Sequence, residues 1–387
     1  MPSKPEPASE GIAYLSDGRL FLKEAGAQSR EILCDYAEQL KERMAQLHQK
    51  YDWTHQPSEP ATGALVWGGN AFHEGHIGTS IAAIAPAGSD GALLYGLNTD
   101  DVAGIFLRPL HQNAEERRLV HTSESNIHTL SAPDDDGQVA CSISGLGGLQ
   151  NLSVYRIGSP GFTEITEGDS LDAAAAWIPG KEGQLVYQTA GIGRDANGQW
   201  VDTGPASIDR LDTTRGEIHP LLHDREHDYL SPQLSEDGTR LYCIRRPYHQ
   251  AGGLDRWLLN LLLTPLRAIG AFARPRRSTP PGESPDARQA RLQGKPFDAE
   301  QLREEAQRRG ESHPDLVPKT WQLIETPLKD PSTSRASVLA KGVIAYALGT
   351  DGQCYYSNGS AIFQVAPDGG KPRLIEEAPN VRQLIVL

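Results

Sequence analysis

The chain has 387 residues and a formal net charge of −13 at neutral pH, with 38% hydrophobic and 22% charged residues. This acidic balance argues against a general nucleic-acid-binding role, because neutralising phosphates requires clustered Lys and Arg. The 39 glycines and 27 prolines indicate a globular chain that is rich in turns.

The first ten residues are polar and lack the apolar stretch of a secretory signal, so we expect a cytoplasmic protein. The four cysteines lie far apart, inside or beside apolar runs, at positions 34, 141, 243 and 354. This placement predicts buried free thiols rather than disulfides or a metal site.

A repeated pattern begins at residue 79. Each copy has an apolar strand, an acidic residue followed by glycine, and a second strand rich in aliphatic and aromatic residues; the acidic–glycine pairs fall at 90–91, 136–137, 182–183, 237–238 and 351–352. Asp-Gly supplies the positive φ angles of a tight turn, so each copy predicts a β-hairpin. The first turns are separated by roughly 46 to 55 residues, and such a period with four short strands is typical of a β-propeller.

The two ends of the chain supply one more unit. Residues 380–387 look like an innermost strand without a hairpin, and residues 11–34 look like strands without an innermost partner. Pairing them closes the ring and removes an open sheet edge. The sequence therefore predicts an all-β, six-bladed propeller with N/C-terminal strand closure and two helical insertions on one face. The expected units are 11–34 with 380–387 (closing blade), 35–78 (helical and loop insertion), 79–122, 123–168 and 169–224 (blades), 225–249 with 319–330 (blade), 250–318 (helical insertion) and 336–377 (blade).

The copy Leu230–Tyr242, with the sequence LSPQLSEDGTRLY, resembles the TolB-type, WD40-like propeller repeat S-P-x-W-S-P-D-G-x-x-I-x-F. Residues Tyr14–Lys23 are also similar to a Y-L-S-D-G-x-L-x-L-K segment of bacterial propeller proteins. The resemblance implies the propeller fold for most of the chain outside the insertions. It implies little about activity, because the TolB-type family includes periplasmic scaffolds, sensors and domains attached to peptidases. TolB itself has a secretion signal and a separate N-terminal α/β domain, which this sequence lacks, so its periplasmic partners are not carried over.

The two insertions are expected on one face because of where they leave their blades. In a four-stranded blade, the loops after strands two and four share a face. The insertion at 35–78 follows a fourth strand and the insertion at 250–318 follows a second strand. The first opens with apolar residues at helical spacing, such as Tyr36, Leu40 and Met44.

Residues 254–272 of the second insertion have the pattern of a broadly apolar helix with a narrow polar stripe. The apolar stretch is shorter than the about 20 residues that a membrane span needs. Three roles stay open: packing on its own propeller, contact with a protein partner or another copy, and interfacial contact with anionic lipid. The residues expected to make the partner or membrane contact are Arg256, Trp257, Leu258, Leu262, Leu266, Arg267, Ile269, Phe272 and Arg274.

Nothing in the sequence has the spacing of a catalytic triad, a nucleotide loop or a zinc site, so we predict no catalytic residue, no metal and no cofactor. Polar residues in loops at the insertion-bearing mouth of the central channel are the candidate binding residues. The alternative is that they cap strand ends and form loop salt bridges. These candidates are Asp169, Arg194, Asp195, His227, Asp228, Arg245, Arg246, Tyr248 and Asn358, and Asp172 belongs to the same group of loops.

From these observations we expect a non-enzymatic scaffold whose decorated face binds a protein partner. A peripheral contact with the inner membrane through residues 254–277 is a further expectation. The alternatives are a small-ligand or peptide sensor at the channel mouth and, less favoured, a metal-dependent hydrolase of the propeller type.

Overall fold

The structure is a computed structural model, and the residues that it describes are 11–40, 42–43, 80–88, 91–99, 102–111, 115–123, 125–134, 136–145, 149–198, 200–248, 308–310, 312–349, 352–367 and 369–387. Most of the two predicted insertions, including all nine helix residues from Arg256 to Arg274, therefore lies outside the described residues. Residues 35–40 are helical, as the apolar spacing at the start of the first insertion predicted.

The described chain is dominated by β-strands. The strands are β1 (Ile12–Ser16), β2 (Arg19–Lys23), β3 (Arg30–Ile32), β4 (Ser80–Pro86), β5 (Ala92–Asn98), β6 (Ala103–Pro109), β7 (Arg117–Thr122), β8 (Asn126–Leu130), β9 (Gln138–Ser144), β10 (Gln150–Arg156), β11 (Phe162–Glu164), β12 (Ser170–Trp177), β13 (Gln184–Arg194), β14 (Trp200–Thr203), β15 (Ser207–Asp212), β16 (Glu217–Leu222), β17 (His227–Leu234), β18 (Arg240–Pro247), β19 (Gln322–Pro327), β20 (Ser337–Lys341), β21 (Ala345–Leu348), β22 (Cys354–Ser357), β23 (Ile362–Val365), β24 (Arg373–Glu376) and β25 (Val381–Val386). A short 3₁₀ helix, η1 (Thr333–Arg335), lies between β19 and β20.

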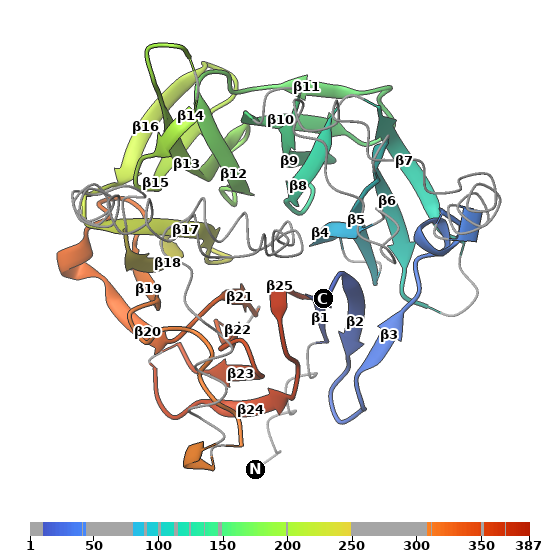
Figure 1. Ribbon diagram of the computed structural model, residues 1–387, viewed down its shortest axis with the longest axis vertical. Helices are drawn as coiled ribbons and strands as arrows, with labels where there is room; N and C mark the ends of the chain where they lie inside the picture. The colour runs from blue at the N-terminus through green and yellow to red at the C-terminus, as the bar shows by residue number, and fades with distance from the viewer. Residues whose placement is uncertain are drawn as a thin grey trace, which may run out of the picture.

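These strands form four four-stranded sheets and one nine-stranded sheet. The sheets surround a common centre in a propeller-like arrangement, with β4, β8, β12, β17, β21 and β25 nearest to it (Figure 1). The nine-stranded sheet contains two antiparallel halves, β8–β11 and β12–β16, joined by one parallel pair between Gln150 of β10 and Leu171 of β12. The predicted all-β, propeller-like class is confirmed.

The predicted pairing of the two chain ends is also confirmed. β25 is the inner neighbour of β1, with Ile12 opposite Val386 and Tyr14 opposite Leu384, in the sheet order β25-β1-β2-β3. The C-terminal strand therefore supplies the inner edge of the sheet that begins the chain (Figure 1).

Each sheet is buried on both faces, which is why its middle strands are nearly continuous apolar runs. In β5, Leu93 and Tyr95 pack towards the β1–β2 sheet, while Leu94, which points the opposite way, packs with Ile127 and Val139 of the next sheet. Alternation along the strand thus fills two separate cores with residues from one strand.

Side chains link neighbouring sheets close to the centre. The inner strands carry bulges, and a bulge leaves backbone groups without a ladder partner. The backbone N–H of Ala174 in β12 donates to Thr129 Oγ1 of β8 at 3.1 Å, and that of Ser231 in β17 donates to Gln188 Oε1 of β13 at 3.0 Å. Ala174 and Ser231 both have left-handed backbones, with φ of 50° and 52°. These contacts stabilise backbone conformations that an L-residue otherwise disfavours.

Two features of the sheets differ from the sequence analysis. β20 pairs with β19, so residues 337–341 belong to the β17–β20 sheet and not to a unit starting at 336. β13 is longer than expected and continues into a projecting hairpin with β14. β20 is the strand that directly follows β19 in the chain, with only η1 between them. The four cysteines are buried thiols that form no disulfide, as predicted.

Candidate functional site

The nine predicted mouth residues lie in three groups rather than in one cluster. The first group is at the β13–β14 hairpin and the second surrounds the start of β17 and the end of β18. The third is a single residue in the loop after β22. The members are Asp169, Arg194 and Asp195 in the first group; His227, Asp228, Arg245, Arg246 and Tyr248 in the second; and Asn358 in the third.

In the first group, Arg194 is held by Asp169. The Arg194 Nη2 and Nε atoms donate to Asp169 Oδ1 at 2.7 and 2.9 Å, and Nη1 donates to the carbonyl of Gly198 at 3.0 Å. The hydrogen bond from Arg194 lowers the pKa of the Asp169 carboxyl. Asp195 Oδ1 accepts the backbone N–H of Asn197 at 2.8 Å. These contacts support the base and tip of the projecting hairpin.

The second group contains a buried ion pair. Asp228 and Arg246 are 3% and 5% exposed, and Arg246 Nε donates to Asp228 Oδ2 at 2.9 Å. The other carboxylate oxygen of Asp228 accepts the backbone N–H of Ala206 at 2.9 Å, and the Arg246 guanidinium lies 4.7 Å from the centre of the Trp321 ring. Burial lowers the pKa of Arg246, while Asp228 opposes that shift. The pair joins β17 and β18 to the segment before β15.

His227 is positioned by Asp224, a residue that the sequence analysis did not select. Asp224 Oδ1 accepts the backbone N–H groups of Glu226 and His227 at 2.8 and 2.6 Å, and Oδ2 accepts the Tyr229 hydroxyl at 2.6 Å. Burial acts to raise the pKa of Asp224, but these hydrogen bonds outweigh it and lower the pKa overall. Asp224 therefore organises the turn that enters β17.

Tyr248 and Arg245 also connect separate elements. The Tyr248 hydroxyl donates to the carbonyl of Thr203 in β14 at 2.6 Å, and its backbone N–H donates to the carbonyl of Glu226 at 2.7 Å. Arg245 Nη2 donates to Gln322 Oε1 of β19 at 2.6 Å. The residue at which the second insertion leaves β18 is thus attached to two other parts of the ring.

Asn358 attaches the other end of the second insertion. It is 1% exposed, and its Nδ2 donates to Asp315 Oδ1 at 3.0 Å and to the carbonyl of Pro314 at 3.3 Å. The backbone N–H of Leu316 donates to the carbonyl of Asn358 at 3.0 Å. Asn358 Oδ1 also accepts the backbone N–H of Ala361 at 3.0 Å, so one side chain closes its own turn and holds the returning segment.

The structure places a further polar group between the two halves of the nine-stranded sheet. Asp172 of β12 is 3% exposed, and its Oδ1 accepts the Thr189 hydroxyl of β13 at 2.6 Å. Burial raises the pKa of Asp209 on β15, and the nearby Asp172 charge raises it further. Burial also raises the pKa of Tyr187, with both carboxylates contributing. These four residues share one face of the β12–β16 half because of the strand register.

The facing half contributes hydroxyl, amide and imidazole groups. Ser142 Oγ of β9 donates to the carbonyl of Asp172 at 2.6 Å and accepts from Gln150 Nε2 at 2.6 Å. His128 Nε2 is 2.7 Å from Ser144 Oγ, and burial lowers the pKa of this imidazole. We call Asp172, Thr189, Asp209, Tyr187, Ser142, Ser144, Gln150 and His128 the polar seam. Only Asp172 was selected from the sequence, as a loop residue, and the structure places it inside β12 instead.

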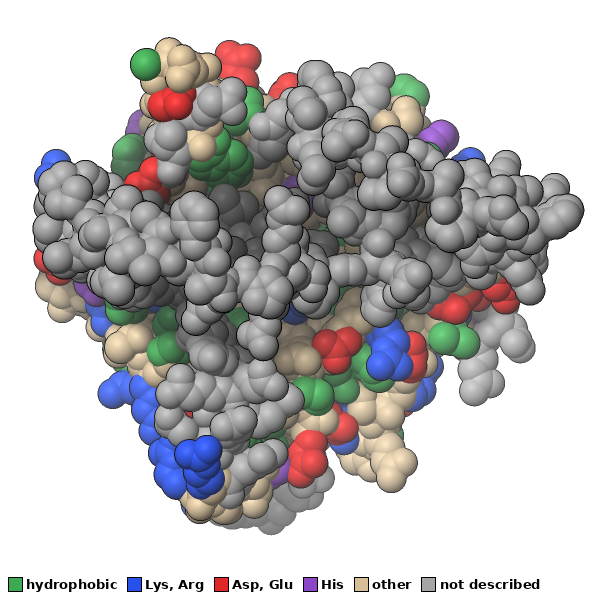
Figure 2. Space-filling view, in the orientation of Figure 1, with side chains coloured by type: hydrophobic (Ala, Val, Ile, Leu, Met, Phe, Trp, Pro, Cys, Tyr) green, Lys and Arg blue, Asp and Glu red, His purple; other side chains and the backbone are tan. Residues whose placement is uncertain are grey.

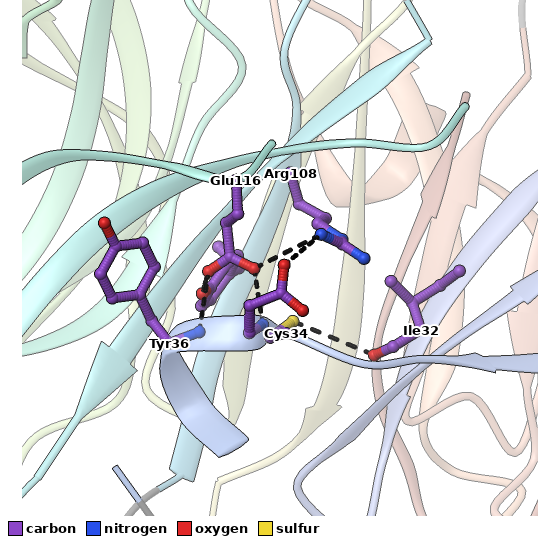
Figure 3. A network of polar contacts seen from close by, with 7 residues as sticks. Ile32, Cys34, Tyr36, Arg108 and Glu116 are labelled. Atoms are coloured by element: carbon purple, nitrogen blue, oxygen red, sulfur yellow. Dashed lines mark hydrogen bonds and ion pairs between the residues drawn. The ribbon is translucent and has the colours of Figure 1, made fainter. Parts of the chain in front are cut away.

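A third polar cluster lies at the periphery, where residues 35–40 meet the β4–β7 sheet (Figure 3). Glu116 precedes β7, and its side chain is 1% exposed. It accepts the backbone N–H groups of Asp35 and Tyr36 at 2.7 and 3.4 Å and the hydroxyl of Tyr95. Arg108 Nη1 lies 3.8 Å from Glu116 Oε2. No local pattern in the sequence indicates this cluster, because Glu116 and Asp35 are 81 positions apart.

Among the described residues, no group of three or more His, Cys, Asp or Glu side chains is arranged to hold a metal ion. None of the helices found in this part of the chain is both long enough and apolar enough to cross a membrane.

Solved structures similar to this chain are β-propellers. The crystal structure of TolB from Acinetobacter baumannii has a TM-score of 0.53 and 12% sequence identity, covering 99% of this chain and 67% of that chain. The crystal structure of a nidogen/laminin complex has a TM-score of 0.54 and 8% identity, covering 97% of this chain and 98% of that chain. At these identities the likeness concerns the fold alone. The sequence matches no protein-family model and no curated protein.

Proposed function

We propose that the protein is a six-bladed, TolB-type propeller scaffold that docks a protein partner on the face bearing its insertions. The count of six treats the two halves of the nine-stranded sheet as separate blades, which the single parallel pair between them supports. The likeness of the repeat at residues 230–242 to the TolB-type motif supports the family assignment.

The attachment of the second insertion carries this proposal. Tyr248 is hydrogen-bonded to Thr203 and Glu226, and residues 313–316 are hydrogen-bonded to the loop after β22. The base of the insertion therefore spans three sheets at the ends where β18 stops and β19 starts. Both attachment points lie at this same set of strand ends, which is why we propose this side of the ring as the docking face.

The first insertion starts at the outer edge of the ring, and this differs from the expectation that both insertions emerge on one face. Residues 35–40 contact the β6–β7 region at the outer edge of the ring (Figure 1). β4, at the far end of that insertion, begins at the same edge of the ring where β18 stops. The outer strand of a twisted sheet runs across the ring rather than along its axis. The described residues on either side of the first insertion therefore lie at the outer rim (35–40) and at the shared face (β4).

The rim of the ring carries both basic and acidic side chains, although the net charge of the chain is −13. In the view of Figure 2, Lys and Arg side chains gather at the lower left margin, whereas Asp and Glu side chains are spread over other parts. A mixed rim around a docking surface supports specific pairing with a partner better than general attraction to anions or cations.

Position-specific photocrosslinking tests the docking face. Lys319 lies just before β19, beside the second insertion, and its side chain is 77% exposed. Lys181 is in the β12–β13 turn at the opposite strand ends. A photoreactive residue at 319 should capture the same partner repeatedly, and one at 181 should not. Equal capture from both positions, or capture from 181 alone, contradicts the proposal.

Replacing residues 254–277 with a Gly/Ser linker of equal length tests the role of the predicted apolar helix. Loss of the partner captured from position 319, with an unchanged far-ultraviolet spectrum, is the expected result. Retained capture means that the segment is not the docking element. Loss of co-sedimentation with anionic vesicles, with partner capture retained, would instead favour the proposed membrane contact.

A small-ligand sensor is the second candidate, because the polar seam brings two carboxylates, a tyrosine and an imidazole into one interface. Ligand binding should raise the unfolding temperature of the wild type but not of Asp172→Asn, and Asp169→Asn serves as the control. A ligand that stabilises both variants equally does not bind at the seam.

A further inference from the structure

The chain contains two asparagine–glycine pairs, Asn197–Gly198 and Asn358–Gly359. Such a pair is chemically labile, because glycine has no side chain to keep its backbone nitrogen away from the preceding side-chain amide. Attack of that nitrogen on the amide carbon closes a five-membered ring and expels ammonia. The two pairs have the same chemistry, so a difference between them in the folded chain comes from their surroundings.

The fold encloses the pair at Asn358. This residue is 1% exposed, and its Nδ2 donates to Asp315 Oδ1 at 3.0 Å. The attacking atom is also engaged, since the Gly359 N–H donates to Ser357 Oγ at 3.1 Å. A Cβ placed on Gly359 would lie 3.0 Å from Leu316 Cβ, so the returning end of the second insertion packs directly against this turn. Ring closure here would require that segment to detach first.

The pair at Asn197 lies at the exposed tip of the β13–β14 hairpin. Residues 195–198 are all exposed, and a Cβ placed on Gly198 would have no atom beyond its chain neighbours within 4 Å. The Gly198 N–H donates to the carbonyl of Asp195 at 3.0 Å, and the Asn197 N–H donates to Asp195 Oδ1 at 2.8 Å. Both hydrogen bonds join residues of one short turn, so this turn can open without disrupting a packed core.

We infer that Asn197 is a site of spontaneous deamidation in the folded protein and that Asn358 is not. The Gly198 backbone nitrogen forms a bond to Asn197 Cγ and gives up its proton, and Nδ2 leaves with that proton as ammonia. Water then opens the succinimide ring at either carbonyl carbon. Cleavage between the nitrogen and Cγ gives aspartate, and cleavage between the nitrogen and the backbone carbonyl carbon gives isoaspartate. One amide and one water become one carboxyl group and one ammonia, without oxidation or reduction.

Isoaspartate changes the hairpin more than aspartate does. Its peptide bond runs through Cγ, so the chain between Asp195 and Gly198 is longer by one carbon and the hydrogen bond that closes the turn no longer fits. The contact from Arg194 Nη1 to the carbonyl of Gly198 at 3.0 Å depends on the same turn. In β14, the carbonyl of Thr203 accepts the Tyr248 hydroxyl at 2.6 Å, where the second insertion leaves β18. Conversion at the tip therefore loosens β14 and this contact, whether or not the proposed partner exists.

Peptide mapping by mass spectrometry of the full chain, incubated at mildly alkaline pH, tests the site. We expect the deamidated peptide to accumulate at residue 197, with isoaspartate among the products, while residue 358 stays intact. The same chain denatured in guanidinium chloride is the matched control, and both pairs should then convert at similar rates. Equal conversion of the two pairs in the folded chain, faster conversion at 358, or no conversion at 197 overturns the inference.

The variant Asn197→Gln separates the chemistry from general ageing of the sample. Its longer side chain would have to close a larger ring, which forms far more slowly, so we expect no conversion at this position. Hydrogen exchange of a peptide covering residues 200–203 should become faster as the wild type ages and should stay constant in Asn197→Gln. A peptide from β9–β10 reports global unfolding and should not change in either protein.

The variant Asn197→Asp separates the new charge from the lengthened backbone. It carries the carboxylate on a normal peptide chain, so β14 should stay as protected as in the fresh wild type. Loss of protection in Asn197→Asp equal to that of the aged wild type would assign the effect to charge and contradict the role of isoaspartate. Wild type that contains isoaspartate at 197 but keeps full protection of β14 contradicts the loosening of the hairpin.

Discussion

The side chain of Gln383 in β25 makes two hydrogen bonds to the backbone of Ile84 in β4. Its Nε2 donates to the Ile84 carbonyl at 2.6 Å, and its Oε1 accepts the Ile84 N–H at 2.8 Å. One amide thus replaces a backbone partner between two inner strands that are 299 positions apart in the chain. The C-terminal strand is thus paired with β1 in its own sheet and fastened by Gln383 to the neighbouring β4–β7 sheet.

Removing this amide should weaken the ring. Gln383→Ala leaves both backbone groups of Ile84 without their partner, and we expect the free energy of unfolding to fall by about 1–3 kcal/mol. Urea denaturation followed by circular dichroism measures the change. Lys371→Ala, at an exposed turn position, is the control and should leave the midpoint unchanged. A Gln383→Ala variant as stable as this control would show that the link does not matter.

The Asp228–Arg246 and Asp169–Arg194 ion pairs should differ in their contribution to the free energy of unfolding. Asp228→Ala removes the carboxylate that pairs with the buried Arg246 guanidinium, so we expect a loss of about 3–5 kcal/mol in the free energy of unfolding. Arg194→Ala breaks the exposed pair with Asp169 and should give no resolvable change, because solvent screens that pair. Equal effects of the two substitutions in urea denaturation would contradict the burial of the Asp228–Arg246 pair.

Glycine is required in the hairpin turns for two separable reasons. Gly238 has φ of 65°, and a Cβ there would lie 3.0 Å from the carbonyl oxygen of Pro179, whereas Gly198 has φ of 77° with nothing within 4 Å. Gly198→Ala should cost about 1–2 kcal/mol from backbone strain alone. Gly238→Ala should cost more, because the neighbouring turn must also move. Thermal unfolding of both variants gives the comparison, and a smaller effect at Gly238 would refute it.

The turn at Asp237 should make stability depend on pH in the acid range. Hydrogen bonds from Ser235 and Thr239 lower the pKa of Asp237 to about 2. A lowered folded-state pKa means that the contribution is present above the ordinary aspartate value of about 3.9 and is lost as the pH falls towards 2. Asp237→Asn should therefore be less stable than the wild type at pH 6, and the difference should shrink by pH 2.5. A difference that does not vary with pH would exclude this carboxylate as its source.

Local sequence patterns were sufficient to predict those parts of the fold that depend on residues close together in the chain. Glycine follows an acidic residue in each repeat, and Gly91, Gly137, Gly183, Gly238 and Gly352 all have left-handed backbones in the turns. The strand that completes the first sheet could also be found at the C-terminus, because one sheet lacked an inner strand. The residues of the candidate site were harder to predict from the sequence. Asp224, Asp209 and Glu116 were missed because their environment is set by residues from other strands.

By itself, the sequence determined the period of the repeats, the hairpin turns and the closure of the ring by β25. Each of these follows from short-range backbone preference or from the need to pair a strand edge. Only the tertiary structure decided what the polar side chains contact. Asn358 is hydrogen-bonded to Asp315, 43 positions away in the chain, and Glu116 is hydrogen-bonded to Asp35, 81 positions away. A hydrogen bond of this kind depends on how neighbouring sheets are stacked, which no local pattern records.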